Sequence, residues 1–98
     1  MVQPSKFKQL EFDWDEDNLR ELGGHDIEFW EAEECFFNPH RVYRNKRKPG
    51  RRYETFKLEG VTDNGRSLLL IFYIKEKTTV RSKTGATALV RVITGWDH

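Results

Sequence analysis

The sequence predicts a single α+β domain over residues 1–98, with two N-terminal helices packed on an antiparallel sheet of about four strands. Helix caps and helix stop signals occupy the first forty residues, and alternating apolar segments follow them. Asp63-Asn64-Gly65, between two of these segments, is a hairpin turn signal. Consecutive strands joined by short turns pair antiparallel, which leaves the helices to cover one face of the sheet.

The N-terminal part is predicted to form one short strand and two short helices. Residues 6–14 alternate loosely and form the strand. Asp15 caps the first helix, which Gly23-Gly24 ends. Asp26 caps the second helix, which Asn38-Pro39 ends. A one-sided helical spacing predicts the inner face of this second helix from Ile27, Trp30, Glu33 or Glu34, and Phe37.

The rest of the chain is predicted to form strands. Their ranges are residues 40–45, 52–61, 66–79 and 86–96. The turns between them are Arg47-Lys48-Pro49-Gly50 and Asp63-Asn64-Gly65, and residues 80–85 form a polar loop. Residues 66–79 include the longest apolar run, so this segment is expected to be the central strand.

Charge is divided unevenly along the chain, although the net charge is only +1. Residues 11–34 contain eleven Asp and Glu and one base, whereas residues 41–57 contain eight Lys and Arg and one acid. The eight cations are Arg41, Arg44, Lys46, Arg47, Lys48, Arg51, Arg52 and Lys57, and they are interleaved with Tyr43, Tyr53 and Phe56. Because cations neutralise phosphates and aromatic rings stack on bases, this segment predicts contact with RNA or DNA.

Two structural explanations of the basic segment stay open. It can be a solvated hairpin whose cations balance the acidic helices, or an edge hairpin whose cations prevent unwanted strand pairing. The acids of residues 11–34 lack the spacing of known metal sites, so no metal or cofactor is expected. The chain has no apolar segment long enough to cross a membrane and no signal peptide at its start, which predicts a cytoplasmic protein without membrane contact.

Two isolated residues have both a chemical and a structural interpretation. His25, at a helix junction, is a candidate general base, and a histidine bonded to the backbone at a helix end is the alternative. Cys35 is the single cysteine and has no neighbouring cation to activate it. We expect it to be a small buried apolar residue.

Short motifs run through the chain in a definite order. They are Phe12-x-Trp14-Asp15, Asn18-Leu19, His25-Asp26-Ile27, Glu33-Glu34-x-Phe36, Asn38-Pro39, Gly60-x-Thr62-x-x-Gly65-Arg66, the apolar strand Leu68 to Tyr73, and Arg91-Val92-Ile93-Thr94. Their order and spacing resemble the BrnT-type toxin family, the ribonuclease half of BrnT–BrnA toxin–antitoxin pairs. The resemblance extends over roughly residues 11 to 97.

The resemblance implies a RelE-like fold and metal-independent RNA cleavage, in which a ribose 2′-hydroxyl attacks the adjacent phosphate. The implied catalytic residues are Arg51, Arg52, Tyr53, Lys57 and Arg66. RNA binding is expected from Arg41, Arg44, Lys46, Arg47, Lys48 and Arg91. The implied partners are RNA, a DNA-binding antitoxin that covers the toxin, and a further copy of the chain in larger complexes.

The sequence departs from the family pattern where two arginines are common. Val61 follows Gly60 at a position where the family commonly has arginine. Gly95-Trp96 follows Ile93-Thr94 of the last strand, where the family commonly has alanine-arginine. The leading hypothesis is therefore a toxin-type endoribonuclease or a catalytically weakened relative. The alternative is a non-enzymatic RNA-binding or protein-interaction module on the same fold. A third hypothesis is a partner-binding protein that uses the acids of residues 11–34.

Overall fold

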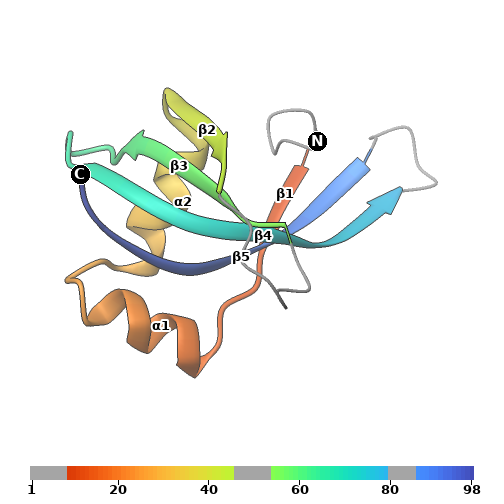
Figure 1. Ribbon diagram of the computed structural model, residues 1–98, viewed down its shortest axis with the longest axis horizontal. Coiled ribbons are helices and arrows are strands. Elements are labelled where there is room, and N and C mark those ends of the chain that lie inside the picture. The colour runs from red at the N-terminus through yellow and green to blue at the C-terminus, as the bar shows by residue number, and fades with distance from the viewer. Residues whose placement is uncertain (1–8, 46–53, 80–85) are drawn as a thin grey trace.

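The computed structural model describes residues 9–45, 54–79 and 86–98, which form a five-stranded sheet with two helices packed against it (Figure 1). The elements in order are β1 (Gln9–Phe12), α1 (Glu16–Gly23), α2 (Phe29–Phe37), β2 (His40–Arg44), β3 (Phe56–Val61), β4 (Ser67–Thr79) and β5 (Ala86–Asp97). The predicted α+β class is confirmed. The predicted turn at Pro49-Gly50 and the loop 80–85 lie outside the described residues.

The sheet differs from the prediction in strand number and in the direction of one strand. Its order is β1-β5-β4-β3-β2, so there are five strands instead of about four. β2 to β5 pair antiparallel, but β1 pairs parallel to β5, with Gln9 opposite Thr87 and Phe12 opposite Val90. A prediction based on short turns could not find this pair, because β1 leads into a helix and its partner is the last strand in the sequence.

α1 begins where the sequence predicts and covers an exposed edge of β5. The Asp15 carboxylate accepts the N–H groups of Asp17 and Asn18, and the Asn18 side chain accepts the Asp15 N–H in return. β1 pairs with β5 only as far as Val90. Beyond that point the buried Asn18 amide donates to the carbonyl of Val92 at 3.2 Å. The first turn of α1 thus supplies a hydrogen bond that a neighbouring strand would otherwise make.

The start and the inner face of α2 were predicted wrongly. The helix begins after Glu28, whose side chain and that of Glu31 form the cap, whereas Asp26 lies in the preceding turn with a φ of 58°. Ala32, Cys35 and Phe36 are buried on the sheet, and Trp30 and Phe37 of the predicted inner face are exposed. A small residue is required at position 35, because α2 packs directly on Gly60 there.

Gly60 shows how close that contact is. A Cβ atom at position 60 would lie 2.9 Å from Cβ and 3.0 Å from the carbonyl oxygen of Cys35. A helix can approach a strand this closely only where both elements carry small residues. Burial also raises the pKa of the Cys35 thiol to about 12, as expected for an unreactive core cysteine.

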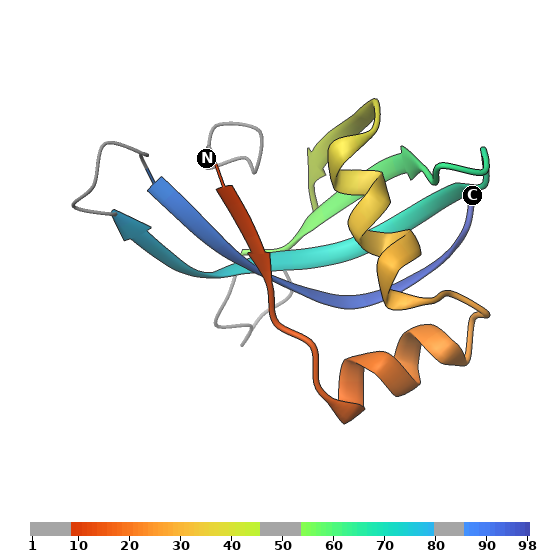
Figure 2. The same ribbon diagram turned by 180° about the vertical axis from the view of Figure 1, so that it is seen from behind.

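The core lies between the two helices and one face of the sheet (Figure 2). Its largest fully buried side chains are Phe72, Leu22, Leu58, Leu68, Leu70, Val90 and Val92. The ring of Phe72 contacts those of Phe36 and Phe56, with centroids 5.0 Å and 5.4 Å apart. Neither described helix is long and apolar enough to span a bilayer.

The turn between β3 and β4 confirms the prediction from Asp63-Asn64-Gly65. Only Gly65 has a positive φ, of 84°, and its N–H donates to the carbonyl of Thr62. Glycine adopts this backbone conformation without a steric penalty. The turn places Arg66 immediately before β4, near the end of β5 and the start of α2.

Candidate RNA-binding site

The described cations of the basic segment belong to β2 and β3, and two of them, Arg41 and Lys57, lie on the sheet face opposite the helices. Val42 pairs with Leu58 on the inner face, so the alternating side chains of Arg41, Tyr43, Lys57 and Glu59 lie on the outer face. In register, Arg41 is opposite Glu59 and Tyr43 is opposite Lys57. We call these four residues the outer β2–β3 face.

Tyr43 connects the polar groups of the outer β2–β3 face. Its hydroxyl donates to Glu59 Oε1 at 2.9 Å, and a hydrogen bond with Tyr43 raises the pKa of Arg41. Glu59 also lies 2.8 Å from His98 Nε2. Lys57 is exposed and forms no ion pair with another described residue. The outer β2–β3 face therefore presents one ammonium group and one guanidinium group beside an aromatic ring and the Glu59 carboxylate.

Arg44 lies at the end of β2 and pairs with Glu54, the one acid of the basic segment, at 2.5 Å. The predicted RNA contacts Lys46, Arg47 and Lys48, and the predicted catalytic residues Arg51, Arg52 and Tyr53, lie outside the described residues. β2 ends at Arg44 and β3 begins at Phe56, so residues 46–53 lie between these two strands in the sequence.

Arg66, another predicted catalytic residue, is bound by the protein itself. Its Nε and Nη2 donate to the two oxygens of Asp97 at 2.7 Å and 3.2 Å. Its Nη1 donates to the Asp26 carbonyl at 2.7 Å and to Glu31 Oε1 at 3.1 Å. The bond to Asp97 raises the pKa of Arg66 and lowers that of Asp97. Arg66 thus joins α2, the α1–α2 connection and β5.

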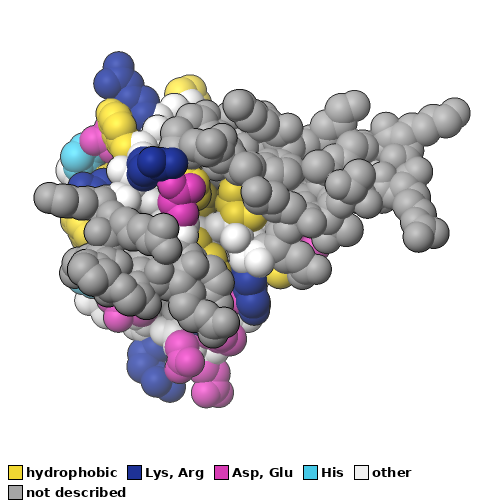
Figure 3. Space-filling model, turned by 45° about the vertical axis from the view of Figure 1, so that its right-hand side comes forward, with side chains coloured by type: hydrophobic (Ala, Val, Ile, Leu, Met, Phe, Trp, Pro, Cys, Tyr) yellow, Lys and Arg dark blue, Asp and Glu magenta, His cyan; other side chains and the backbone are white. Residues whose placement is uncertain are grey.

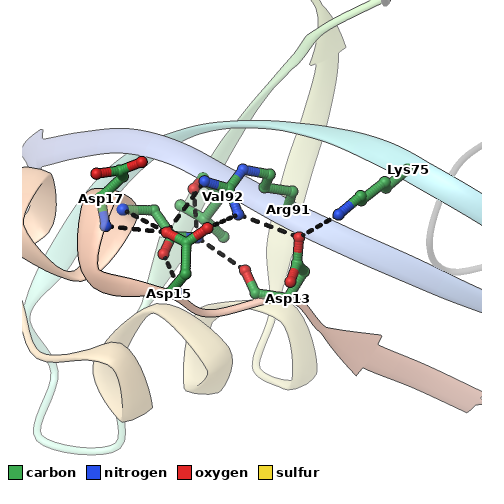
Figure 4. Close-up of polar contacts among 7 residues, drawn as sticks. Asp13, Asp15, Asp17, Lys75, Arg91 and Val92 are labelled. Carbon is green, nitrogen blue, oxygen red and sulfur yellow. Dashed lines mark hydrogen bonds and ion pairs between the residues drawn. The ribbon is translucent and has the colours of Figure 1, made fainter.

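Arg91 is held in a similar way near the start of α1 (Figure 4). Its Nη1 lies 3.1 Å from Asp13 Oδ2 and 3.0 Å from Asp15 Oδ2, and Lys75 Nζ reaches the same Asp13 oxygen at 2.9 Å. The bond with Lys75 lowers the pKa of Asp13, and the bond with Arg91 lowers that of Asp15. These contacts attach the segment after β1 to β4 and β5.

The structure does not bring the described catalytic candidates to one point. Lys57 lies on the outer β2–β3 face, whereas Arg66 turns toward α2 and Arg91 turns toward the start of α1. β4 lies between Lys57 and Arg91: Lys57 is opposite Ile71 and Arg91 is opposite Tyr73, so two strand spacings, about 10 Å, and an offset of two residues along β4 separate Lys57 from Arg91. At the positions where the resemblance leads one to expect arginine, Val61 is partly buried and Trp96 packs near His25, with ring centroids 6.4 Å apart.

The acidic N-terminal part pairs with cations from the second half of the chain. Within the described residues, its carboxylates bind Arg66, Lys75 and Arg91, and none pairs with a cation of residues 41–57. The described cations of the basic segment, Arg41, Arg44 and Lys57, thus form no ion pair with the acids of residues 11–34, and the other five cations of the segment lie outside the described residues. Over the described surface in Figure 3, Lys and Arg side chains alternate with Asp and Glu and do not gather into one patch.

The histidines show contacts that are structural. His25 Nε2 lies 3.4 Å from Glu21 Oε2, one turn earlier in the chain, and His40 Nδ1 lies 2.7 Å from the carbonyl of Asn38. Among the described residues, the side chains in contact with His25 are Glu21 and Trp96, and neither is a nucleophile or a phosphate-binding group. In residues 9–45, 54–79 and 86–98, no group of three or more His, Cys, Asp or Glu could hold a metal ion.

No family model matches the chain, and no curated protein matches it. Function is therefore argued from the residues, their positions in the fold and the ordered motifs. The sequence shows where the cations are, but it could not tell those with carboxylate partners from those without. It also missed the aromatic face of α2, although the signal was present: a helix of nine residues with apolar side chains on two sides.

Proposed function

We propose that the protein acts on RNA through the outer β2–β3 face and the adjoining residues 46–53, as a metal-independent endoribonuclease of the toxin type. The observation that supports this is the separation of charge. Lys57 and Arg41 lie on an outer sheet face, while three acids of residues 11–34, Asp13, Asp15 and Glu31, pair with Arg66, Lys75 or Arg91. Cations that are not held by carboxylates are available for phosphates. The proposed setting is the cytoplasm, with a DNA-binding antitoxin as partner.

The proposed chemistry needs a group that accepts the 2′-hydroxyl proton, a group that protonates the leaving oxygen, and cations that stabilise the extra negative charge. We assign these roles to Arg51, Arg52, Tyr53 and Lys57. Arg66 and Arg91 are assigned to maintaining the fold, because each already binds two carboxylates. The RelE-like arrangement implied by the ordered motifs remains part of this proposal.

A second candidate is a non-enzymatic RNA-binding or protein-interaction module. It is favoured by the contacts of Arg66 and Arg91, because a phosphate would have to displace two carboxylates from either guanidinium. Val61 and Trp96, at the positions where the related pattern has arginine, support the same candidate. The ribonuclease and the RNA-binding form of the second candidate place RNA on the same hairpin and differ only in cleavage.

Incubation of purified protein with a single-stranded RNA in EDTA separates the two candidates. For the ribonuclease we expect cleavage that survives EDTA and products with a 2′,3′-cyclic phosphate, which is the product of 2′-hydroxyl attack. Arg52→Ala and Tyr53→Phe should each lower the rate by about 10²-fold or more, the usual contribution of a group that transfers a proton or stabilises charge. Arg20→Ala is the matched control, since Arg20 is exposed on α1 and forms no ion pair with described residues.

Intact RNA that binds and shifts in a gel, at protein concentrations well above the dissociation constant, would leave the binding module as the function. Absence of both cleavage and binding would reject the ribonuclease and the RNA-binding module, and would leave the protein-interaction module. Equal urea midpoints of the variants and the wild-type protein would show that lost activity does not reflect unfolding.

A further inference from the structure

The outward side of α2 carries large aromatic side chains that the core does not use. Phe29, Trp30 and Phe37 are 41 %, 50 % and 67 % exposed. Trp30 and Phe37 belong to the helical stripe that the sequence pattern assigned to the core, whereas the residues actually buried are Ala32, Cys35 and Phe36. A single exposed apolar residue is ordinary, but a connected group of them is typical of an interaction surface.

These side chains belong to a connected aromatic strip. From Phe37 the strip passes to Phe12, Trp14, Phe29 and Trp30, with ring-centroid separations of 6.2, 6.4, 6.0 and 5.3 Å. Its rings come from β1, from the segment after β1 and from α2. The Trp14 indole N–H donates to Glu33 Oε2 at 2.8 Å, so the strip is also fixed by a hydrogen bond. A surface held in this way is ordered before a partner arrives.

The charged groups of the pocket at the Trp30 and Phe37 end of the strip are all acidic. A pocket of about 290 Å³ next to it is lined by Trp30, Glu33, Glu34, Phe37, Asn38 and Asp63, with no Lys or Arg among them. Glu34 accepts the Asp63 N–H at 3.0 Å, and Asn38 donates to Asp63 Oδ1 at 2.9 Å. These bonds use neutral donors, so the three carboxylates of the pocket keep their negative charge without a cationic partner among the described residues.

We propose that this surface, the aromatic strip of Phe12, Trp14, Phe29, Trp30 and Phe37 with its acidic pocket, docks a cationic amphipathic segment of a partner protein. Apolar side chains of the segment cover the aromatic rings, and an Arg or Lys enters the pocket between Trp30 and Phe37. A cation there gains both ring-face and carboxylate interactions. The proposal does not depend on RNA binding.

Charge decides the class of partner. The phosphates of RNA and DNA would face three carboxylates, and so would an anionic lipid surface, which makes both unfavourable occupants. A peptide segment with basic side chains on an apolar helix face matches the aromatic strip and the acidic pocket at once. Such a segment binds to a helix surface through a few regularly spaced anchors.

The test uses two synthetic helical peptides with the same leucine and alanine pattern, one carrying arginines and the other glutamates at the polar positions. Titration of the full chain into fluorescently labelled peptide, monitored by fluorescence anisotropy, should show binding of the arginine peptide alone. Trp30→Ser and Phe37→Ser should each weaken binding by at least about tenfold, as truncation of an aromatic anchor does. Leu19→Ser is the matched control, since Leu19 is 40 % exposed on α1 and does not line the surface.

Glu34→Gln keeps the acceptor for the Asp63 N–H and removes one charge. It should therefore lower the affinity for the arginine peptide about threefold and leave the fold intact. Equal binding of the glutamate peptide, or undiminished affinity of Phe37→Ser, would overturn the proposal. It would also be overturned if the wild-type chain self-associates and Phe37→Ser makes it monomeric, because the occupant would then be a second copy of this chain.

Discussion

Two groups of cations that look alike in the sequence have different surroundings in the fold. Arg66 and Arg91 each bind two carboxylates and join elements far apart in the chain. Lys57 and Arg41 lie on the outer β2–β3 face, where Lys57 has no described carboxylate partner. A cation therefore indicates nucleic-acid contact only when the fold leaves it without an acid, and that information depends on tertiary structure.

The largest effect is expected at Arg66. Arg66→Ala should lower the free energy of unfolding by about 2 kcal/mol, because the Asp26 carbonyl and two carboxylates lose their shared donor. Arg66→Lys should recover only part of this loss, since an ammonium cannot bind both oxygens of Asp97 as a guanidinium does. Urea unfolding followed by circular dichroism measures both. An Arg66→Ala protein as stable as the wild type would show that the carboxylate contacts of Arg66 do not stabilise the fold, and would contradict the distinction between structural and available cations.

An intermediate effect on stability is expected when the pH is lowered, because Asp13 and Asp15 then lose their charges. Their pKa values are lowered in the folded protein, so the stability they provide is present above about pH 4, where free aspartates titrate, and is lost as the pH falls through the folded values. The urea midpoint of the wild-type protein should therefore drop between pH 6 and pH 3.

Arg91→Ala should reduce that acid-dependent drop, because it removes the main partner of Asp15 and one of two partners of Asp13. Lys57→Ala should leave the drop unchanged and serves as the control. Identical pH profiles for the wild-type and Arg91→Ala proteins would show that these contacts contribute nothing to stability in solution.

The smallest effect on stability is expected on the outer β2–β3 face. Lys57→Ala should change the free energy of unfolding by no more than about 0.5 kcal/mol, as is usual for an exposed side chain without partners. It should nevertheless weaken RNA binding and reduce the slope of log affinity against log salt by about 0.7, the value for one phosphate contact with a single strand. Binding to a single-stranded RNA measured by fluorescence anisotropy at several salt concentrations gives the slope. An unchanged slope would place the RNA away from Lys57.

Local signals in the sequence predicted most of the fold. Asp15 caps α1, Asn38-Pro39 follows α2 and Gly65 closes the β3–β4 turn, because each depends on neighbours within a few residues. Two features could not be predicted in this way. The parallel pairing of β1 with β5 joins the ends of the domain, and the inner face of α2 was decided by its contact with Gly60.

For the candidate site, the sequence could predict which segment is rich in cations, but not which cations are paired with acids. Residues 41–57 stand out as basic in the sequence, but Arg66 and Arg91 resemble them until Asp97, Glu31, Asp13 and Asp15 are placed in space. The acids that neutralise them lie between 31 and 78 positions away along the chain. No spacing rule relates residues so far apart, whereas a helix cap or a turn is specified within one short segment.

The position of β5 has a consequence for how the chain folds during synthesis. β5 pairs with β1, lies beside α1 and accepts the hydrogen bond of Asn18, which is 74 positions earlier in the chain. β1 and α1 therefore leave the ribosome long before the strand that orders them. Contacts of such long sequence separation slow folding and leave apolar groups such as Leu22 uncovered in the nascent chain. We expect native structure to form only after β5 has been released, in a single late step.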